Sequence, residues 1–561
     1  MAAWSEATVA LEACGAISAL RSQAILTLAD TNALHTMSQH NTFPGGDTAS
    51  IWYGTFEPPT FPALARDARA DVCIVGAGIA GLSTAYQLTK AGKKVIVVDD
   101  GTIGGGESGR TTAHLANAMD DRIYLLEHVH GDDGARLIVQ SHGAAVEQID
   151  QIVRAERIDC DFERVDGFLF LGGSDGQDVL DAELAAAHRV GWTSVSRLDR
   201  VPNIEYNLGP CLRFPNQGQF HLLKYLAGLA SAIVSGGGRI YCETKVSGVE
   251  GGSPCKVETE KKHTITADAV CVCTNASIAD MFKTHLKQAP YRTFVIAAVI
   301  PRGSVPHALY WDTPDPYHYV RVQRLDPPVA GATTGDAQFD ALIVGGEDHK
   351  TGHEDDAPQR WSRLESWMRE RWPQTREVIY RWSGQVLEPN DYIAFIGPNP
   401  DGAENVYMAS GDSGQGMTHG TIAGMLLSDL ILGRPNEWAS LYDPRRVSMR
   451  AKPMEEFAKE NADVALRYVK DYVSPGDVAT EADIPRGEGR IIRHGLHKVA
   501  AYRDEKGGMH THSAACTHLK CIVQWNSAEK SWDCPCHGSR FDPYGKVLNG
   551  PAITDLEPVE E

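Results

Sequence analysis

A glycine-rich turn between two apolar runs most constrains how this chain can fold. The segment from Asp71 to Asp99 starts with an apolar run that ends in Gly76-Ala77-Gly78-Ile79-Ala80-Gly81, and it closes with a second apolar run, Val95 to Val98. An amphipathic stretch that ends at Gly92 separates them, and this order is typical of a β-α-β unit. A purely structural glycine turn is the alternative, but the flanking runs and the terminal acid favour a dinucleotide site.

Each glycine of the motif has a separate expected role. Gly76 permits the tight turn, Gly78 lets backbone N–H groups approach a pyrophosphate, and Gly81 lets the helix pack closely on the strand. The positive end of the helix, at Ile79 and Ala80, then faces the phosphates. Asp99 follows at about the spacing of an acid that hydrogen-bonds a ribose hydroxyl.

Length and charge limit the classes of protein to consider. A chain of 561 residues predicts two to four domains, and 42% hydrophobic with 22% charged residues is ordinary for a globular protein. The formal charge of -20 argues against nucleic acid and anionic membrane partners. No window holds eighteen uninterrupted apolar residues, so we expect no membrane span.

The N-terminal stretch has the wrong charge for a targeting signal. Arg21 is the only fixed positive charge in residues 1–36, against Glu6, Glu12 and Asp30. That balance fits neither a signal peptide nor a mitochondrial presequence, so a cytoplasmic location is the default.

The C-terminal cysteines form a second motif. Cys516-Thr517-His518 and Cys534-Pro535-Cys536-His537 each supply one cysteine and one histidine. A Rieske 2Fe-2S cluster needs this set, with two thiolates on one iron and two imidazoles on the other. Zinc also accepts two Cys and two His, but a typical zinc finger places Cys with Cys and His with His.

The loop that follows the β-α-β unit carries a family resemblance. Gly104-Gly105-Gly106 leads into Ser108-Gly109-Arg110-Thr111-Thr112-Ala113-His114. With the Asp71 to Asp99 unit, this Ser-Gly-Arg segment resembles the D-amino acid oxidase-like FAD-dependent oxidoreductases, which include glycine and sarcosine oxidases. The group usually has Asn-Ala-Gly or a similar run after the arginine, where this chain has Thr111 to His114. Some members carry FAD on a histidine, so the resemblance raises a covalent link through His114.

Later segments fit the same resemblance. It implies that Val246 approaches the adenine, that Thr274 to Ala276 returns the chain to the cofactor, and that the glycine loop before the helix at Gly416 faces the pyrimidine end of the flavin. The motif and the resemblance together give these expected FAD contacts: Gly76, Gly78, Ile79, Ala80, Gly81, Asp99, Arg110, Thr111, Thr112, His114, Val246, Thr274, Asn275, Ala276, Gly411, Gly414, Gln415, Gly416, Met417 and Thr418.

The predicted fold is an α/β Rossmann-like FAD-binding domain with an inserted α+β antiparallel-sheet substrate domain, followed by a small all-β Rieske domain. Strands are expected at 294–300, 317–322 and 339–345, and loops at 198–204 and 214–220. The expected boundaries are an extension at 1–50, FAD-binding parts at 51–150, 221–288 and 388–435, substrate parts at 151–220 and 289–387, a connector at 436–482 and the Rieske domain at 483–561.

The resemblance also implies substrate contacts. Arg321 stands where relatives hold an arginine that binds a substrate carboxylate, and His318 and Tyr319 lie beside it. A structural ion pair or a solvated surface position is the alternative for Arg321. His349 and His353 have helical spacing for a metal, but the polar residues around them favour a solvated loop.

The tail resembles the Rieske proteins of cytochrome bc complexes. That resemblance implies a disulfide between Cys521 and Cys536, which ties the two ligand loops together. Phe541 stands where high-potential members usually have tyrosine, whereas Ser539 keeps the other hydrogen-bond donor. We therefore expect a reduction potential below that of the respiratory proteins.

A flavin and a 2Fe-2S cluster in one chain predict an oxidoreductase. A small amine, amino acid or N-methyl compound would be oxidised at its C–N bond, and the electrons would leave through the cluster to an external protein, quinone or oxygen. A flavin/Rieske electron-transfer or redox-sensing protein is the alternative. A Rieske oxygenase is less favoured, because no Asp/Glu-x-x-His-x4-His run for a mononuclear iron is found.

Overall fold

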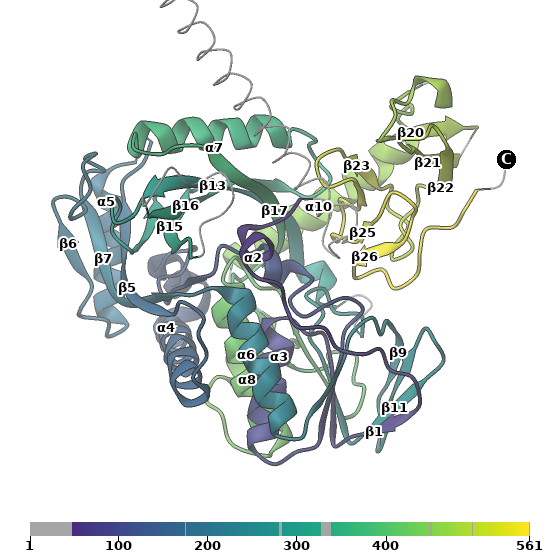
Figure 1. Ribbon diagram of the computed structural model, residues 1–561, viewed down its shortest axis with the longest axis horizontal. Helices are drawn as coiled ribbons and strands as arrows, with labels where there is room; N and C mark the ends of the chain where they lie inside the picture. The colour runs from purple at the N-terminus through teal and green to yellow at the C-terminus, as the bar shows by residue number, and fades with distance from the viewer. Residues whose placement is uncertain are drawn as a thin grey trace, which may run out of the picture.

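The computed structural model describes residues 48–559 except 174, 280–282, 327–337, 448–450, 479 and 496. Nearly all of the expected N-terminal extension, residues 1–47, therefore lies outside the described residues. Figure 1 shows two large parts that share the body of the molecule, with the C-terminal strands β20 to β26 at one side. No helix in the described ranges combines the length and the apolar character needed to cross a bilayer.

A six-stranded sheet carries the glycine motif. Its order is β18-β19-β12-β2-β3-β8, and every neighbouring pair is parallel except β18 with β19. The motif forms β2, α3 and β3 as the sequence predicts. The bounds are Val72–Val75 for β2, Ile79–Lys90 for α3, Val95–Val98 for β3, Arg239–Tyr241 for β8, Ala269–Val272 for β12, Phe395–Pro398 for β18 and Val406–Ser410 for β19.

Both faces of this sheet are buried, which explains its continuous apolar strands. Val72 and Ile74 pack in the cluster that contains the helices α3, α6 and α8, whereas Cys73 and Val75 pack against a second, four-stranded sheet. The added bounds are Leu222–Ser235 for α6, Gly416–Ile431 for α8, Ala68–Arg69 for β1, Val246–Glu250 for β9, Cys255–Thr259 for β10 and Thr264–Ala267 for β11.

A nine-stranded sheet forms the other large part, with the order β17-β13-β16-β15-β14-β5-β7-β4 and β6 paired to β7. It is antiparallel except where β14 runs parallel to β5. In Figure 1 α7 lies across β13, β15 and β16. The bounds are His114–Leu115 for β4, Glu163–Phe170 for β5, Ser196–Leu198 for β6, Cys211–Gln219 for β7, Gln288–Pro301 for β13, Leu309–Asp312 for β14, Tyr319–Arg324 for β15, Phe339–Lys350 for β16, Val378–Pro389 for β17, Ile123–Glu156 for α4, Gln177–Arg189 for α5 and Ala357–Arg371 for α7.

Two loop predictions are wrong. Most of 214–220 lies in β7, and the turn residues Pro215 and Asn216 sit where the register with β5 shifts; Asn216 has a φ of 63°. Such residues are tolerated in a β-bulge. The segment around His349 is also strand, because β16 continues to Lys350 and pairs with β13 there. The ring of His349 stacks on Phe294, with 5.5 Å between the ring centroids.

The C-terminal part consists of a three-stranded sheet, β20-β21-β22, and a four-stranded sheet, β23-β24-β25-β26. One long helix, α10, precedes it. The bounds are Ile51–Thr55 for α2, Ala439–Tyr442 for α9, Ala451–Val473 for α10, Glu488–His494 for β20, His497–Arg503 for β21, Met509–Ser513 for β22, Gln524–Asn526 for β23, Ser531–Asp533 for β24, Arg540–Phe541 for β25 and Val547–Asn549 for β26.

Candidate active site and cluster site

One cavity of about 970 Å³ lies over the carboxyl ends of β2 and β3. The glycine motif, the nine-stranded sheet, α10 and the C-terminal segment 547–553 all contribute to its wall. These predicted FAD contacts line it: Gly76, Gly78, Ile79, Ala80, Asp99, Arg110, Thr111, Thr112, His114, Val246, Thr274, Asn275, Gly411, Gly414, Gln415, Gly416 and Met417. Gly81, Ala276 and Thr418 lie behind the wall.

The glycines form a cradle that side chains would fill. Gly76 has a φ of 109°, and a Cβ atom there would lie 2.3 Å from the carbonyl oxygen of Cys273. A Cβ atom on Gly78 would lie 2.8 Å from the Ser108 hydroxyl, and one on Gly81 would lie 1.9 Å from the Gly76 carbonyl oxygen. The N-cap residue of α3 is Gly78, which has no side chain to cap the helix, and the first turn of α3 faces this space. The arrangement fits the pyrophosphate of a dinucleotide.

Asp99 lines the cavity beside this cradle. Its carboxylate accepts hydrogen bonds from the backbone N–H groups of Ala77, at 2.6 Å, and Gly101, at 2.8 Å. Burial, and then the charge of Asp100, raise the pKa of Asp99 to about 7. The position suits the ribose contact expected from the sequence, which stays a prediction.

The start of α8 forms the opposite end of the cradle. Gly411 and Gly414 have φ values of 70° and 68°, and a Cβ atom on Gly414 would lie 2.6 Å from Asp120 Oδ2. Thr418 is one turn into the helix, where its hydroxyl donates to the Gln415 carbonyl oxygen at 3.1 Å and contacts His142. Thr418 therefore supports the turn and does not face the cavity.

His114 is held by both ring nitrogens. Nε2 lies 3.4 Å from the carbonyl oxygen of Val320, and Nδ1 lies 3.0 Å from the Thr112 hydroxyl. Burial, and then the charge of Arg321, lower the pKa of His114 to about 3. Both ring nitrogens are therefore engaged by the protein, and the covalent link to FAD stays a prediction.

The three predicted substrate contacts separate in the structure. Tyr319 lines the cavity, and its hydroxyl lies 2.6 Å from that of Thr293. His318 points to the other face of the sheet, as alternation along a strand requires. Its ring stacks on Trp367 of α7 at 4.2 Å, and its Nδ1 lies 2.8 Å from Asp312.

Arg321 is buried away from the cavity. Its guanidinium donates to the main-chain carbonyl oxygens of Thr112, Ala113 and Phe220 and to the side chain of Gln323. These bonds hold the loop that contains Thr112 and His114. Arg321 thus has a structural environment, but it is built from main-chain carbonyl groups and Gln323, and not from the ion pair or the solvated surface position that were its alternatives.

The four predicted cluster ligands converge from two loops. Cys516 and Cys534 are buried, and the interaction between their thiols lowers the pKa of Cys516 to about 7. The rings of His518 and His537 lie 5.1 Å apart, and buried Nδ1 of His537 has no hydrogen-bond partner among the described residues. Paired sulfurs beside paired imidazoles, one of them with a free nitrogen, fit the donor set of a Rieske cluster.

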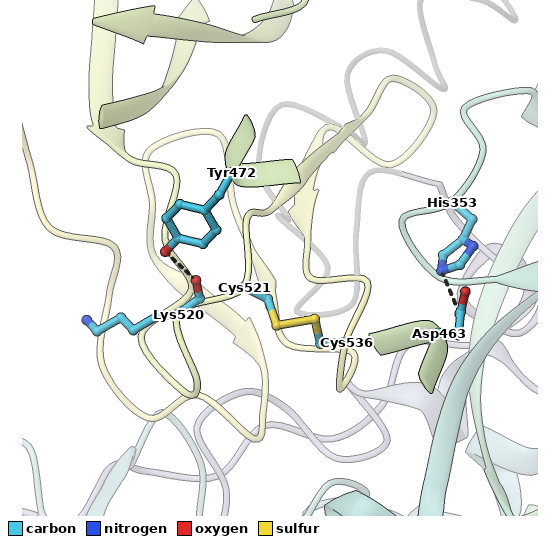
Figure 2. Close-up of a disulfide and its surroundings, with 6 residues drawn as sticks. All are labelled: His353, Asp463, Tyr472, Lys520, Cys521 and Cys536. Atoms are coloured by element: carbon cyan, nitrogen blue, oxygen red, sulfur yellow. Dashed lines mark hydrogen bonds and ion pairs between the residues drawn. A yellow bond between two sulfur atoms is a disulfide. The ribbon is translucent and has the colours of Figure 1, made fainter. Parts of the chain in front are cut away.

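The predicted disulfide between Cys521 and Cys536 is confirmed. The sulfurs of Cys521, Cys534 and Cys536 lie within 4.8 Å of one another, but two of them are bonded together and leave Cys534 alone as a thiolate donor. Figure 2 shows Tyr472 of α10 donating to the carbonyl oxygen of Lys520, beside the disulfide. Figure 2 also shows Asp463 of α10 paired with His353 at 3.7 Å, so this histidine contacts a helix and not solvent alone.

A buried network of charges, here called the docking network, joins the C-terminal part to the body. Arg292 of β13 lies 3.2 Å from Asp533, and Arg110 lies 3.2 Å from Glu529. The side chains of Arg292 and Asp533 are 2% and 1% exposed. Its members are Arg110, Arg292 and Arg540 with Glu107, Glu529 and Asp533.

Direct contacts also link the cluster loop to the cavity wall. Gln385, which lines the cavity, donates from Nε2 to the carbonyl oxygen of Gly538 at 2.9 Å. Asn549 donates to Glu107, another lining residue, at 2.9 Å. The ring of His285 lies 5.2 Å from that of His518. The cluster loops therefore contact the body of the molecule through Gly538 and His518, although none of the four ligands lines the cavity.

Sequence reasoning missed several residues of this site. Asp120, Asp348, Gln385 and Asn549 line the cavity but belong to no motif. One signal in the sequence points to Asp348: it follows closely on the apolar run that ends at Gly345, and β16 continues through it to Lys350. The contact between Gln385 and Gly538 joins residues 153 positions apart, which no local pattern predicts.

Comparisons with known proteins agree with this geometry. Residues 71–430 match the sequence profile of the family described as FAD dependent oxidoreductase (DAO), and residues 474–560 match that of the Rieske [2Fe-2S] domain.

YhfW of Bacillus subtilis is 32% identical to this chain, over 91% of this chain and 97% of the YhfW chain. Its name describes it as a Rieske 2Fe-2S iron-sulfur protein. Gamma-glutamylputrescine oxidoreductase of Escherichia coli is 28% identical, covering 66% of this chain and 86% of its own. The crystal structure of L-proline dehydrogenase from P. horikoshii shares the fold with a TM-score of 0.54 and 17% identity, over 68% of this chain and 98% of that one.

Proposed function

Since this chain belongs to the DAO family of FAD-dependent oxidoreductases and carries a Rieske [2Fe-2S] domain, we propose that it oxidises a small amine, amino acid or N-methyl compound and passes the electrons through the cluster to an external acceptor. Oxidation of the C–N bond to an imine releases two electrons and two protons. When bound, FAD takes up the electrons as a pair, and the cluster passes them on singly.

The contact between Gln385 and Gly538 carries the proposal. Gly538 directly follows the predicted ligand His537, and Gln385 belongs to the cavity wall. One side chain thus spans from the candidate flavin site to the cluster loop. This contact brings the two sites together in one chain, which supports electron transfer from one to the other.

The residues around the cavity have defined tasks in this proposal. Gly76, Gly78 and the start of α3 hold the pyrophosphate, and the start of α8 places positive partial charge at the flavin ring. Segment 547–553 of the Rieske domain covers the same cavity and helps to exclude water. Tyr319 and its neighbours in the nine-stranded sheet position the substrate, and catalysis comes mainly from this positioning.

Anaerobic stopped-flow absorbance tests the proposal. The purified holoenzyme is mixed with a panel of amines, amino acids and N-methyl compounds, and the flavin and cluster bands are followed separately. At least one compound should bleach the flavin, with cluster reduction following. Indifference to the whole panel, with reduction only by a protein donor, would instead support the electron-transfer or redox-sensing alternative.

A further inference from the structure

We propose that the substrate of this cavity carries a positively charged nitrogen and no carboxylate, and that Asp120 and Asp348 bind its ammonium group. This inference rests on the proposed function, in which the cavity is the place of amine oxidation, and it names the class of amine.

Carboxylates dominate the part of the cavity wall that the nine-stranded sheet, α10 and the loop before α4 provide. Asp120, Asp121, Asp315, Asp348, Glu388, Glu456 and Glu460 line it, against Arg122, Lys452 and Lys459. Lys459 lies 3.6 Å from Glu456, and Arg122 donates to the carbonyl oxygen of Asp312. Lys350, outside the cavity wall, also lies 2.8 Å from Glu460. Acidic groups still outnumber basic ones here, and burial raises the pKa of Asp120, Asp121 and Glu388, so a bound cation would be stabilised by their ionised forms.

Asp348 offers an acceptor that no described residue satisfies. Its Oδ1 atom is shielded from solvent and receives no hydrogen bond from the described part of the chain. Burial raises the pKa of Asp348 to about 7; the nearby Thr293 opposes that shift, and the charge of Asp120 adds to it. An unpaired buried acceptor is unfavourable, and the N–H groups of an ammonium ion would satisfy it.

Asp120 and two tyrosine rings complete the pocket. Asp120 accepts hydrogen bonds from the hydroxyl of Tyr317 and, at 2.8 Å, from Nε2 of Gln415. The rings of Tyr317 and Tyr319 lie 5.5 Å apart, and both line the cavity. Carboxylates beside aromatic faces form a typical environment for an alkylammonium group, because the ring faces also attract cations.

Arg321 is not placed to recognise a substrate carboxylate in the cavity. Its Nη1 and Nη2 atoms donate to main-chain carbonyls and to Gln323, and its buried Nε, which has no partner among the described residues, does not line the cavity. Arg110 lines the cavity but is paired with Glu529. On this part of the wall a substrate carboxylate would therefore meet seven acidic side chains and only Arg122, Lys452 and Lys459 as basic ones among the described residues.

Calorimetric titration of the oxidised holoenzyme at pH 8 tests the inference with three probes of equal length: n-butylammonium, butyrate and 1-butanol. We expect n-butylammonium to bind roughly tenfold or more tightly than the other two. Asp348→Asn and Asp120→Asn should each weaken n-butylammonium roughly tenfold and leave 1-butanol unchanged. Glu347→Gln is the matched control, since Glu347 neighbours Asp348 on β16 but pairs with Arg363 outside the cavity.

Several outcomes would overturn it: butyrate binding more tightly than n-butylammonium, unchanged affinity in both aspartate variants, or Mg²⁺ alone occupying the acidic groups while n-butylammonium does not bind. The wild-type probe series decides the charge preference even if a variant fails to fold.

Reduction assays separate this inference from the proposed function. Flavin reduction only by carboxylate-bearing amino acids would overturn the inference and leave the function intact. Tight n-butylammonium binding, lost in the aspartate variants, would support the inference even if no amine reduced the flavin, which would remove the function.

Discussion

Nε2 of Gln385 donates a hydrogen bond to the carbonyl oxygen of Gly538 at 2.9 Å and so joins the wall of the cavity to a ligand loop of the cluster site. The main-chain N–H of Gln385 donates to Glu107, which also accepts from Asn549 of the Rieske domain. Glu107 belongs to the glycine-rich loop after β3. The two redox sites therefore share a hydrogen-bonded wall.

The docking network should be sensitive to the loss of a single charge. Glu529→Gln leaves Arg110 buried beside a neutral partner, and breaking such a pair costs about 3–5 kcal/mol. We expect faster proteolysis between the flavoprotein body and the Rieske domain, together with slower reduction of the cluster after the flavin. Asp355→Asn is the control, because Asp355 contacts Ser527 at an exposed edge of the same interface. Equal behaviour of the two variants would show that the network does not hold the domains together.

Acid should weaken the same interface. Burial raises the pKa of Asp533, but Arg540 and Arg292 outweigh burial and lower it to about 2. Because the folded pKa lies below the value of ~3.9 in an unfolded chain, the stabilisation is complete above pH ~5 and is lost as the pH falls toward 2. The difference corresponds to about 2–3 kcal/mol.

Unfolding free energies measured across this range for wild type and Asp533→Asn check the prediction. The variant should be less stable at pH 7 and should lose less stability between pH 5 and pH 3. Parallel curves would assign acid sensitivity to another group.

Hydrogen bonds to the cluster sulfurs should set its potential. The Ser539 hydroxyl interacts with the Cys516 thiol and lowers its pKa, whereas Phe541, which is buried, offers no hydroxyl. A donor stabilises the reduced cluster because its sulfurs are more negative. Ser539→Ala should lower the midpoint potential and Phe541→Tyr should raise it, each by about 40 mV if the bond differs by ~1 kcal/mol between the two states. A redox titration that finds either shift absent or reversed contradicts this account.

Close packing at the glycine motif should be required for FAD binding. A Cβ atom on Gly81 would lie 1.9 Å from the backbone oxygen of Gly76, which cannot move without shifting the turn. Gly81→Ala should therefore yield protein with little bound FAD, measured by absorbance after purification. Gly248→Ala in β9, where no atom lies within 4 Å of the new Cβ, should keep its FAD. Full occupancy in Gly81→Ala would refute the assigned role of this glycine.

Sequence patterns predict those parts of the molecule that depend on residues close together in the chain. The β-α-β unit, α8, the Cys-His ligand pairs and the disulfide each leave a signal within a few residues or match a known family. The bulged strand β7 was missed because Pro215 and Asn216 carry turn chemistry that a bulge also accepts. The role of Arg321 depends on main-chain carbonyls of residues 112, 113 and 220, which pattern analysis could not bring together. The docking network likewise pairs residues hundreds of positions apart, such as Arg292 and Asp533.

Dependence of cluster reduction on protein concentration tests the central claim most directly. The holoenzyme is reduced anaerobically at the flavin by a light pulse in the presence of a photochemical donor, and the appearance of the reduced cluster is followed over a wide range of protein concentrations. Electron transfer inside one docked chain predicts a rate constant that does not change with concentration and that falls in Glu529→Gln. A rate that rises in proportion to concentration, or a cluster that stays oxidised beside a reduced flavin, would contradict the account.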